Sequence, residues 1–106
     1  RRHGALLIFD EVITGFRVAP GGAQELYGVL PDITTFAKAL GGGFPIAAFG
    51  GSEELMGLEA RNEVMHGGTY TANVVALAAA NAVLEAMSSQ RDEIWNRLNT
   101  LGEQLR

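Results

Sequence analysis

The stretch Ala5-Leu6-Leu7-Ile8-Phe9-Asp10-Glu11, an apolar run that ends in two acidic residues, decides the fold of this 106-residue chain. An apolar run without alternation is typical of a strand buried on both faces of a parallel α/β sheet. Two further strands are predicted, at Ile33–Ala37 and Ile46–Phe49. About twenty residues separate the first strand from the second, which is enough for a crossover to a parallel neighbour. Only Lys38 to Pro45 separate the second from the third, so the third strand is predicted to be antiparallel.

The rest of the chain is predicted to be largely helical. A short helix is expected after Ser52, with acidic residues in its first turn. Residues 73–87 are almost all Ala, Val and Leu, which predicts a mostly buried helix with a narrow polar stripe. A half-exposed amphipathic helix is expected next, with Ile94 and Leu98 on its apolar face. The sequence leaves open whether Ser88-Ser89-Gln90 separates these two helices.

The predicted helices are too few for the predicted sheet. Three strands with little helix between them cannot cover both faces of a parallel sheet. We therefore expect residues 1–106 to be an interior fragment of a larger α/β domain, with no complete domain boundary inside. The sheet of that domain is expected to be mixed and mostly parallel, with one antiparallel strand, and to be followed by helices.

The composition excludes several classes of partner. Twelve Asp and Glu against eight Lys and Arg give a net charge of −4, without a basic run for nucleic acid or acidic lipid. The longest apolar stretch, Val74 to Ala80, is too short to cross a bilayer. We therefore expect neither nucleic acid nor a membrane as partner. The chain has no cysteine and two histidines, so no metal site is expected, and a cytoplasmic location fits.

Asp10 lies at the carboxyl end of the first predicted strand, where open α/β sheets bind ligands. Three roles fit a carboxylate at this place. Apolar residues followed by Asp-Glu match a Walker B strand, which holds Mg²⁺ in a nucleotide hydrolase. A carboxylate also keeps the pyridinium nitrogen of a cofactor protonated. The third role is structural, because Asp often caps a helix or anchors a loop.

Lys38 is the only lysine, and its neighbours Phe36-Ala37 and Ala39-Leu40 are apolar. This context predicts burial, and a buried lysine loses the hydration of its charged form and becomes a neutral, nucleophilic amine. Such an amine forms a Schiff base with an aldehyde. The preceding residues do not match G-x-x-x-x-G-K-[ST], so Lys38 is not a P-loop lysine. The alternative is a lysine that extends from a sheet edge into solvent.

Two glycine-rich segments have different contexts. Gly41-Gly42-Gly43 leads into a strand and not into a helix, so a tight turn with positive φ is expected there. His66-Gly67-Gly68-Thr69 precedes the long helix, where free N–H groups and hydroxyls could bind a phosphate. The alternative is a plain helix start with Thr71 or Asn73 as N-cap. No role is assigned to His66.

Four motifs occur in order, and together they carry a resemblance. They are Asp10-Glu11-Val12-Ile13-Thr14-Gly15-Phe16-Arg17, Pro31-Asp32, Ala37-Lys38-Ala39-Leu40-Gly41-Gly42-Gly43-Phe44-Pro45 and His66-Gly67-Gly68-Thr69. In this order the chain resembles the class III aminotransferases, which are pyridoxal-phosphate enzymes of fold type I. The resemblance extends from about Gly4 to Met87. The residues around Arg17 and the run Gly21-Gly22-Ala23-Gln24 are most similar to the glutamate-1-semialdehyde aminomutase subgroup.

The resemblance implies a cofactor site for pyridoxal 5'-phosphate. Lys38 would form the internal aldimine with the cofactor and later move the proton between carbons. Asp10 would pair with the pyridinium nitrogen, and Val12 would pack against the ring. Thr69 would bind the cofactor phosphate in the neighbouring subunit's site, which implies a homodimer. The expected fold is therefore a part of the large, cofactor-binding domain of a fold type I enzyme.

The implied activity is transfer of an amino group between a small amino compound and a carbonyl compound. An aminomutase does this on one substrate, but the family's usual Gly-Asn-Pro run is replaced here by Ala72-Asn73-Val74, which leaves a β- or ω-amino-acid transaminase open. Other parts of the site would lie outside these residues, so the fragment alone is expected to be inactive. Glu11 and Arg17 match motif positions without an assigned role. A nucleotide hydrolase and a cofactor-free homologue, which would tolerate Lys38→Ala, are the alternatives.

Overall fold

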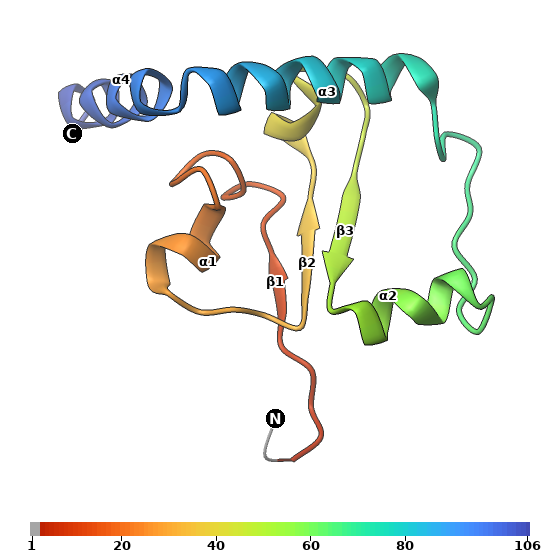
Figure 1. Ribbon diagram of the computed structural model, residues 1–106. Coiled ribbons are helices and arrows are strands. Elements are labelled where there is room, and N and C mark those ends of the chain that lie inside the picture. The colour runs from red at the N-terminus through yellow and green to blue at the C-terminus, as the bar shows by residue number, and fades with distance from the viewer. Residues whose placement is uncertain (1–2) are drawn as a thin grey trace.

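A three-stranded mixed sheet forms the centre of the computed structural model, which describes residues 3–106 (Figure 1). The strands are β1 (Ile8–Asp10), β2 (Ile33–Phe36) and β3 (Ala48–Gly51), in that order across the sheet. Strands β1 and β2 are parallel, whereas β2 and β3 are antiparallel. The predicted mixed sheet with a reversed third strand is confirmed, although the strand ends differ from the predicted bounds by up to three residues.

The connections contain two short helices that the sequence did not reveal. Helix α1 (Gly22–Tyr27) lies in the crossover from β1 to β2, and a 3-10 helix, η1 (Lys38–Gly41), follows β2 directly. Both are shorter than two full turns, so neither shows a hydrophobic period. After η1, Gly42 has φ +57° and Gly43 has φ +105°, which confirms the predicted glycine turn.

The predicted helices of the second half of the chain are present. Helix α2 (Glu53–Ala60) follows Ser52, whose Oγ accepts a hydrogen bond from the Leu55 N–H at 3.4 Å. Helix α3 (Val74–Ser89) and helix α4 (Arg91–Gln104) run nearly end to end across the top of the sheet (Figure 1), and Gln90 separates them. No helix within residues 3–106 is both long enough and apolar enough to span a lipid bilayer.

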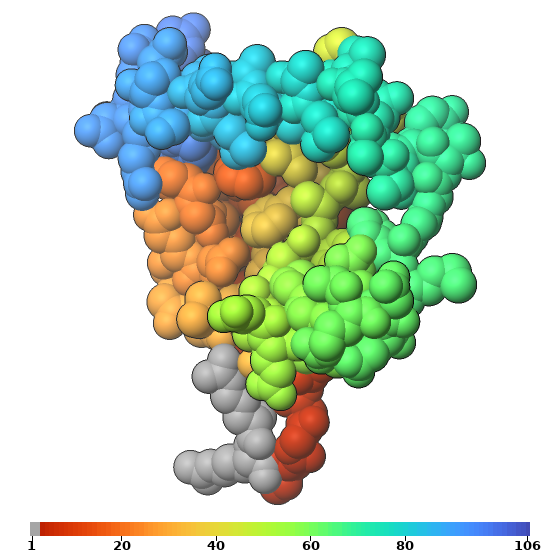
Figure 2. Space-filling model, turned by 45° about the vertical axis from the view of Figure 1, so that its right-hand side comes forward, coloured from red at the N-terminus to blue at the C-terminus, as the bar shows by residue number. Residues whose placement is uncertain are grey.

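A small core forms where α3 lies over η1, and Figure 2 shows α3 and α4 covering this end of the molecule. Ala76 and Ala80 of α3 and Leu40 of η1 are buried there. The contact is close, because a Cβ on Gly42 would lie 2.7 Å from Cγ2 of Val83. Small residues at this crossing therefore bring the long helix down onto the end of β2.

Two burial predictions are wrong for this chain. Strand β1 was expected to be buried on both faces, but the side chain of Ile8 is 56% exposed. Helix α3 was expected to be mostly buried, but only Ala76 and Ala80 are, and Val74 is 77% exposed. The reason is that β1 has a neighbour on one side only, and α3 contacts only η1 and α4 to any extent. The apolar residues of β1 and α3 therefore predict more burial than the helices and strands of residues 3–106 provide.

Asn73 decides where α3 begins, and its substitution tests this. Its Oδ1 accepts a hydrogen bond from the Ala76 N–H at 3.0 Å, so Asn73, not Thr71, is the N-cap. We expect Asn73→Ala to lower the free energy of unfolding by about 1 kcal/mol, measured by urea unfolding of the purified protein. Asn81→Ala, at an exposed position inside the same helix, is the control and should not destabilise. Equal losses in both variants would contradict the capping role.

Candidate active site

The carboxyl ends of β1 and β2 bring together the two residues with the clearest chemistry. Asp10 is the last residue of β1 and lies opposite Thr35 in β2, and Lys38 follows two residues after β2 ends. Because the strands are parallel, Asp10 and Lys38 emerge at the same edge of the sheet (Figure 1). In open α/β sheets this edge is where ligands bind.

One of the two carboxylate oxygens of Asp10 accepts hydrogen bonds within the chain. Its Oδ1 accepts hydrogen bonds from the Val12 N–H and the Thr35 hydroxyl, each at 3.1 Å. Among residues 3–106, nothing donates a hydrogen bond to the other oxygen, Oδ2. The side chain is exposed. The carboxylate is therefore held in place by its own loop and strand while Oδ2 can accept a hydrogen bond from a ligand.

Lys38 is exposed, and the prediction of a buried lysine is wrong. Residues of η1 divide between two environments, because Leu40 is buried under α3 while Lys38 faces solvent. The apolar neighbours that suggested burial thus serve the helix contact and do not enclose the amine. The backbone of Lys38 has φ +44°, a left-handed conformation that favours glycine. Such a conformation costs energy in a residue with a side chain, and residues of this kind are common at ligand sites.

Lys38 lines an open cavity of about 580 Å³ between the loop after β1, η1 and α3. Arg17 lies on the same cavity, so two cationic side chains face one space. The glycine turn, at Gly42 and Gly43, forms another part of the wall. Among the described residues, the guanidinium of Arg17 has no carboxylate partner. This arrangement suits a ligand that is anionic or has carbonyl or phosphate oxygens.

Of the other predicted site residues, Val12 lies near Asp10 and Thr69 does not. Val12 is half-buried in the loop after β1, close in sequence to Asp10. Thr69 lies in the exposed segment before α3, which Figure 1 places beyond β3 and away from η1. In the same segment, His66 pairs with Glu59 at 3.5 Å and packs edge-on against Phe49. The structure therefore brings Asp10, Val12 and Lys38 to one edge and leaves Thr69 apart.

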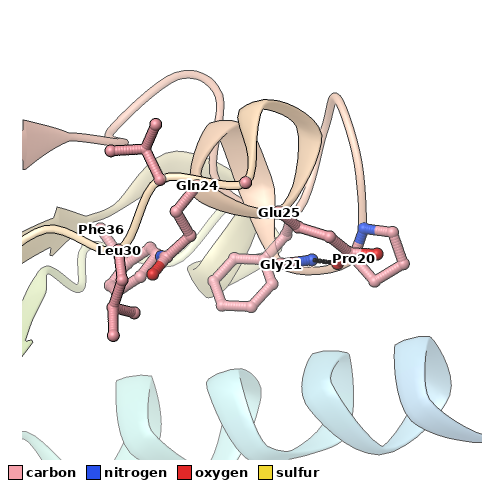
Figure 3. Close-up of a pocket in the computed structure, with 9 residues that line it drawn as sticks. Pro20, Gly21, Gln24, Glu25, Leu30 and Phe36 are labelled. Atoms are coloured by element: carbon pink, nitrogen blue, oxygen red, sulfur yellow. Dashed lines mark hydrogen bonds between the residues drawn. The ribbon is translucent and has the colours of Figure 1, made fainter.

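A second cavity, of about 470 Å³, lies between α1 and β2 and is largely apolar (Figure 3). Phe16 and Phe36 line it, with ring centroids 5.3 Å apart. Its one charged side chain, Glu25, accepts a hydrogen bond from the Gly21 N–H at 2.5 Å and pairs with Arg91 at 3.0 Å. The ionisable group on this cavity is thus already engaged, and the cavity offers no nucleophile.

Glu11 is a buried residue whose contacts the sequence did not reveal. Its side chain is 1% exposed, and its carboxylate accepts hydrogen bonds from the Thr14 hydroxyl at 2.6 Å and from the N–H groups of Ala23 at 2.7 Å and Gln24 at 2.9 Å. Burial alone would raise the pKa of Glu11, but the three hydrogen bonds outweigh it and hold this pKa below its ordinary value.

A glycine accompanies Glu11, and it is a signal that the sequence did offer. Gly22 has φ +73°, and a Cβ at this position would collide with the Glu11 carboxylate. The pair Gly21-Gly22 before a short helix therefore marks a place where a side chain comes very close to the backbone. Together with an acidic residue at a strand end, it could have identified a buried carboxylate on the start of α1.

Comparisons with known proteins identify the family of this chain. Residues 1–106 match the aminotransferase class-III family. The chain is 46% identical over 104 residues to the glutamate-1-semialdehyde 2,1-aminomutase of Salinibacter ruber, across 97% of this chain and 24% of that relative. An omega-transaminase from Sphaerobacter thermophilus is similar in structure, with a TM-score of 0.86 and 44% identity over 100% of this chain and 24% of that one.

A further structure is similar, that of a transaminase with pyridoxal phosphate bound, with a TM-score of 0.83 and 36% identity over 95% of this chain and 24% of that one. This chain belongs to the class III aminotransferase family. The predicted family and fold class are confirmed. The chain spans about a quarter of the length of the curated relatives that it matches.

The lowered pKa of Glu11 predicts a particular sensitivity to acid. A carboxyl whose pKa is lower in the folded than in the unfolded protein stabilises the fold fully above the unfolded value, and this stabilisation is lost as the pH falls through the folded pKa. We therefore expect the difference in melting temperature between the wild type and Glu11→Gln to be largest near neutral pH. The difference should shrink as the pH falls below the ordinary value of 4.5. A difference that is constant across pH would contradict the charged state assigned to Glu11.

Proposed function

We propose that this chain forms part of the cofactor site of a pyridoxal-phosphate enzyme that transfers an amino group between a small amino compound and a carbonyl compound. The observation that carries the proposal is the placement of Asp10 and Lys38 on the ends of neighbouring parallel strands. Membership of the class III aminotransferase family supports it. We propose further that residues 1–106 are an interior segment of the large domain of a longer enzyme.

The residues at this edge fit the cofactor. Lys38 offers a primary amine for the cofactor aldehyde, and Asp10 offers the unoccupied Oδ2 for the N–H of the pyridinium ring. Val12, in the loop that begins beside Asp10, is the apolar residue available to the ring face. When bound, pyridoxal phosphate supplies an electron sink that stabilises negative charge on the substrate carbon.

Each residue has a task that follows from its chemistry. The primary amine of Lys38 would hold the cofactor covalently through its aldehyde carbon, with the aldehyde oxygen released as water. As a free base beside the reacting carbon, the Lys38 amine would hold the proton that moves between carbons. The Asp10 carboxylate keeps the proton on the ring nitrogen, and its own orientation is maintained by Val12 and Thr35.

The similarity supports two versions of the reaction. One relative is an aminomutase at 46% identity, and one structural neighbour is an omega-transaminase at 44% identity. In both versions the chemistry at Lys38 and Asp10 is the same. Substrate selection differs, and Arg17 on the cavity wall is the residue of this chain best placed to meet a substrate anion.

The nucleotide hydrolase alternative has no support. A Walker B pair would need its second carboxylate next to the nucleotide, but the carboxylate of Glu11 is buried and occupied by three donors of its own chain. Nothing in the comparisons indicates a hydrolase. A structural homologue without a cofactor would make Lys38 dispensable, and the first experiment below tests this.

The segment that carries Thr69 supports a homodimer. Exposed apolar side chains flank this residue, among them Met65 at 97%, Tyr70 at 74% and Val74 at 77%. Apolar surface of this kind favours contact with another protein surface. We propose that a second copy of the enzyme packs here and that Thr69 donates its hydroxyl to the cofactor phosphate in the partner's site.

The covalent role of Lys38 is tested in the full-length enzyme. Reduction with borohydride after incubation with pyridoxal phosphate adds hydride to the C=N carbon and is expected to fix the cofactor on Lys38. Peptide mass mapping should find the adduct on the peptide that holds Lys38, and Lys38→Arg should remove it while leaving the fold intact. An adduct only on another lysine, or none in the wild type, would overturn the proposed function.

The role of Thr69 in trans is tested by pairing two variants. The Thr69→Ala enzyme is expected to bind pyridoxal phosphate about tenfold more weakly, because a hydrogen bond to a charged phosphate is lost. In heterodimers with Lys38→Ala, the intact Lys38 lies beside an intact Thr69 of the partner. At limiting cofactor, borohydride should therefore trap more cofactor on Thr69→Ala subunits in heterodimers than in homodimers. Equal trapping in both would show that Thr69 serves its own subunit.

A further inference from the structure

Glu11 connects three segments that meet directly behind Asp10. Its carboxylate accepts the hydroxyl of Thr14 in the loop and the N–H groups at the start of α1, such as that of Ala23. Its own N–H donates to the carbonyl of Thr35 in β2 at 3.0 Å. One buried residue thus attaches the loop and the helix to the middle of the sheet.

The same contacts hold the donors of Asp10. Its Oδ1 is fixed by Val12 and by Thr35, and both donors lie next to a hydrogen bond of Glu11. Val12 follows Glu11 in the chain, and the carbonyl of Thr35 accepts the Glu11 N–H. A shift of Glu11 would therefore displace both donors and rotate the Asp10 carboxylate.

A second set of contacts leads from Glu11 to Lys38. The Gly15 N–H donates to the Glu11 carbonyl at 2.9 Å, and a Cβ on Gly15 would lie 2.8 Å from Cδ1 of Phe36. The next residue, Phe16, packs its ring on Phe36, which is two residues before Lys38. The loop that Glu11 anchors is therefore in direct contact with the strand end that carries Lys38.

Only a carboxylate satisfies all the donors that face this position. Thr14, Ala23 and Gln24 each offer a hydrogen, and an ionised carboxylate is a pure acceptor. A glutamine of the same shape would turn an NH₂ group toward an N–H donor, and Gly22 leaves no room for it to move aside. The arrangement of these hydrogen bonds therefore requires the ionised form of Glu11.

We infer that Glu11 is a positioning residue of the cofactor site: its buried carboxylate holds residues 12–24 so that Asp10 meets the ring nitrogen while Lys38 meets the aldehyde. This inference rests on the proposed function, and it assigns a role to a residue that does not touch the cofactor. The competing interpretation is that Glu11 stabilises the fold without affecting the orientation of Asp10.

The test compares Glu11→Gln with Glu25→Gln in the full-length enzyme, below the melting temperature of both. Glu25 is a matched control, since it also accepts an N–H of this loop, that of Gly21, but it is exposed and pairs with Arg91 of α4. Glu11→Asp, which keeps the charge, replaces Glu11→Gln if that variant does not fold. The readouts are the Kd of pyridoxal phosphate and the pH midpoint of the bound cofactor's absorbance, which follows protonation of the C=N nitrogen and responds to the charge that Asp10 would maintain on the ring nitrogen.

A positioning role predicts that Glu11→Gln weakens cofactor binding about tenfold and shifts the pH midpoint, while Glu25→Gln changes neither. In an Asp10→Asn background, Glu11→Gln should have almost no further effect on either readout, because the two residues act as one unit. The positioning role would be wrong if Glu11→Gln lowered the melting temperature but left both readouts unchanged. It would also be wrong if the effects of Glu11→Gln and Asp10→Asn were additive. In either case the proposed function would stand. A wild type that binds no cofactor at Lys38 would overturn the proposed function and this inference with it.

Discussion

The buried carboxylate of Glu11 is the interaction on which the rest of the structure depends. A carboxylate without water around it is tolerated only when hydrogen bonds replace its hydration, and Glu11 obtains three of them from its own chain. To supply these donors, the chain after β1 must turn back and begin α1 beside the strand that it has just left. The crossover to β2 follows from this turn. The parallel pairing that brings Asp10 and Lys38 to one edge is therefore linked to a single ionised group.

The two chemical groups at that edge are held in different ways. Asp10 is fixed by two hydrogen bonds through one oxygen, whereas Lys38 is fixed through its backbone, between the end of β2 and the glycine turn under α3. A rigid carboxylate suits a partner that stays in place, such as a ring nitrogen. A long side chain on a rigid backbone suits an amine that must bond, release and return. The fixed carboxylate of Asp10 and the longer side chain of Lys38 on a fixed backbone agree with the proposed tasks of these residues.

Features that depend on local residue types could be predicted from the sequence. The strand before Asp10, the glycine turn after Lys38 and the helix after Ser52 all follow from short-range rules of burial, φ angle and capping. Helix α1 escaped prediction because its six residues show no period, and the contacts of Glu11 escaped because two of its three donors, Ala23 and Gln24, lie more than ten residues away. The choice between Thr71 and Asn73 as N-cap likewise needed the geometry of a particular N–H.

The wrong predictions share one cause. An apolar sequence pattern predicts that side chains are buried, but it does not identify the surface that buries them. Ile8, Val74 and Lys38 were expected to be buried, but all three are exposed because the described elements cover them only in part. For Lys38 this difference matters chemically. An exposed amine keeps its hydration, and desolvation requires a wall on the open side of the cavity. In the proposed enzyme, the bound ligand or further surfaces of the longer chain would complete the environment that makes Lys38 reactive.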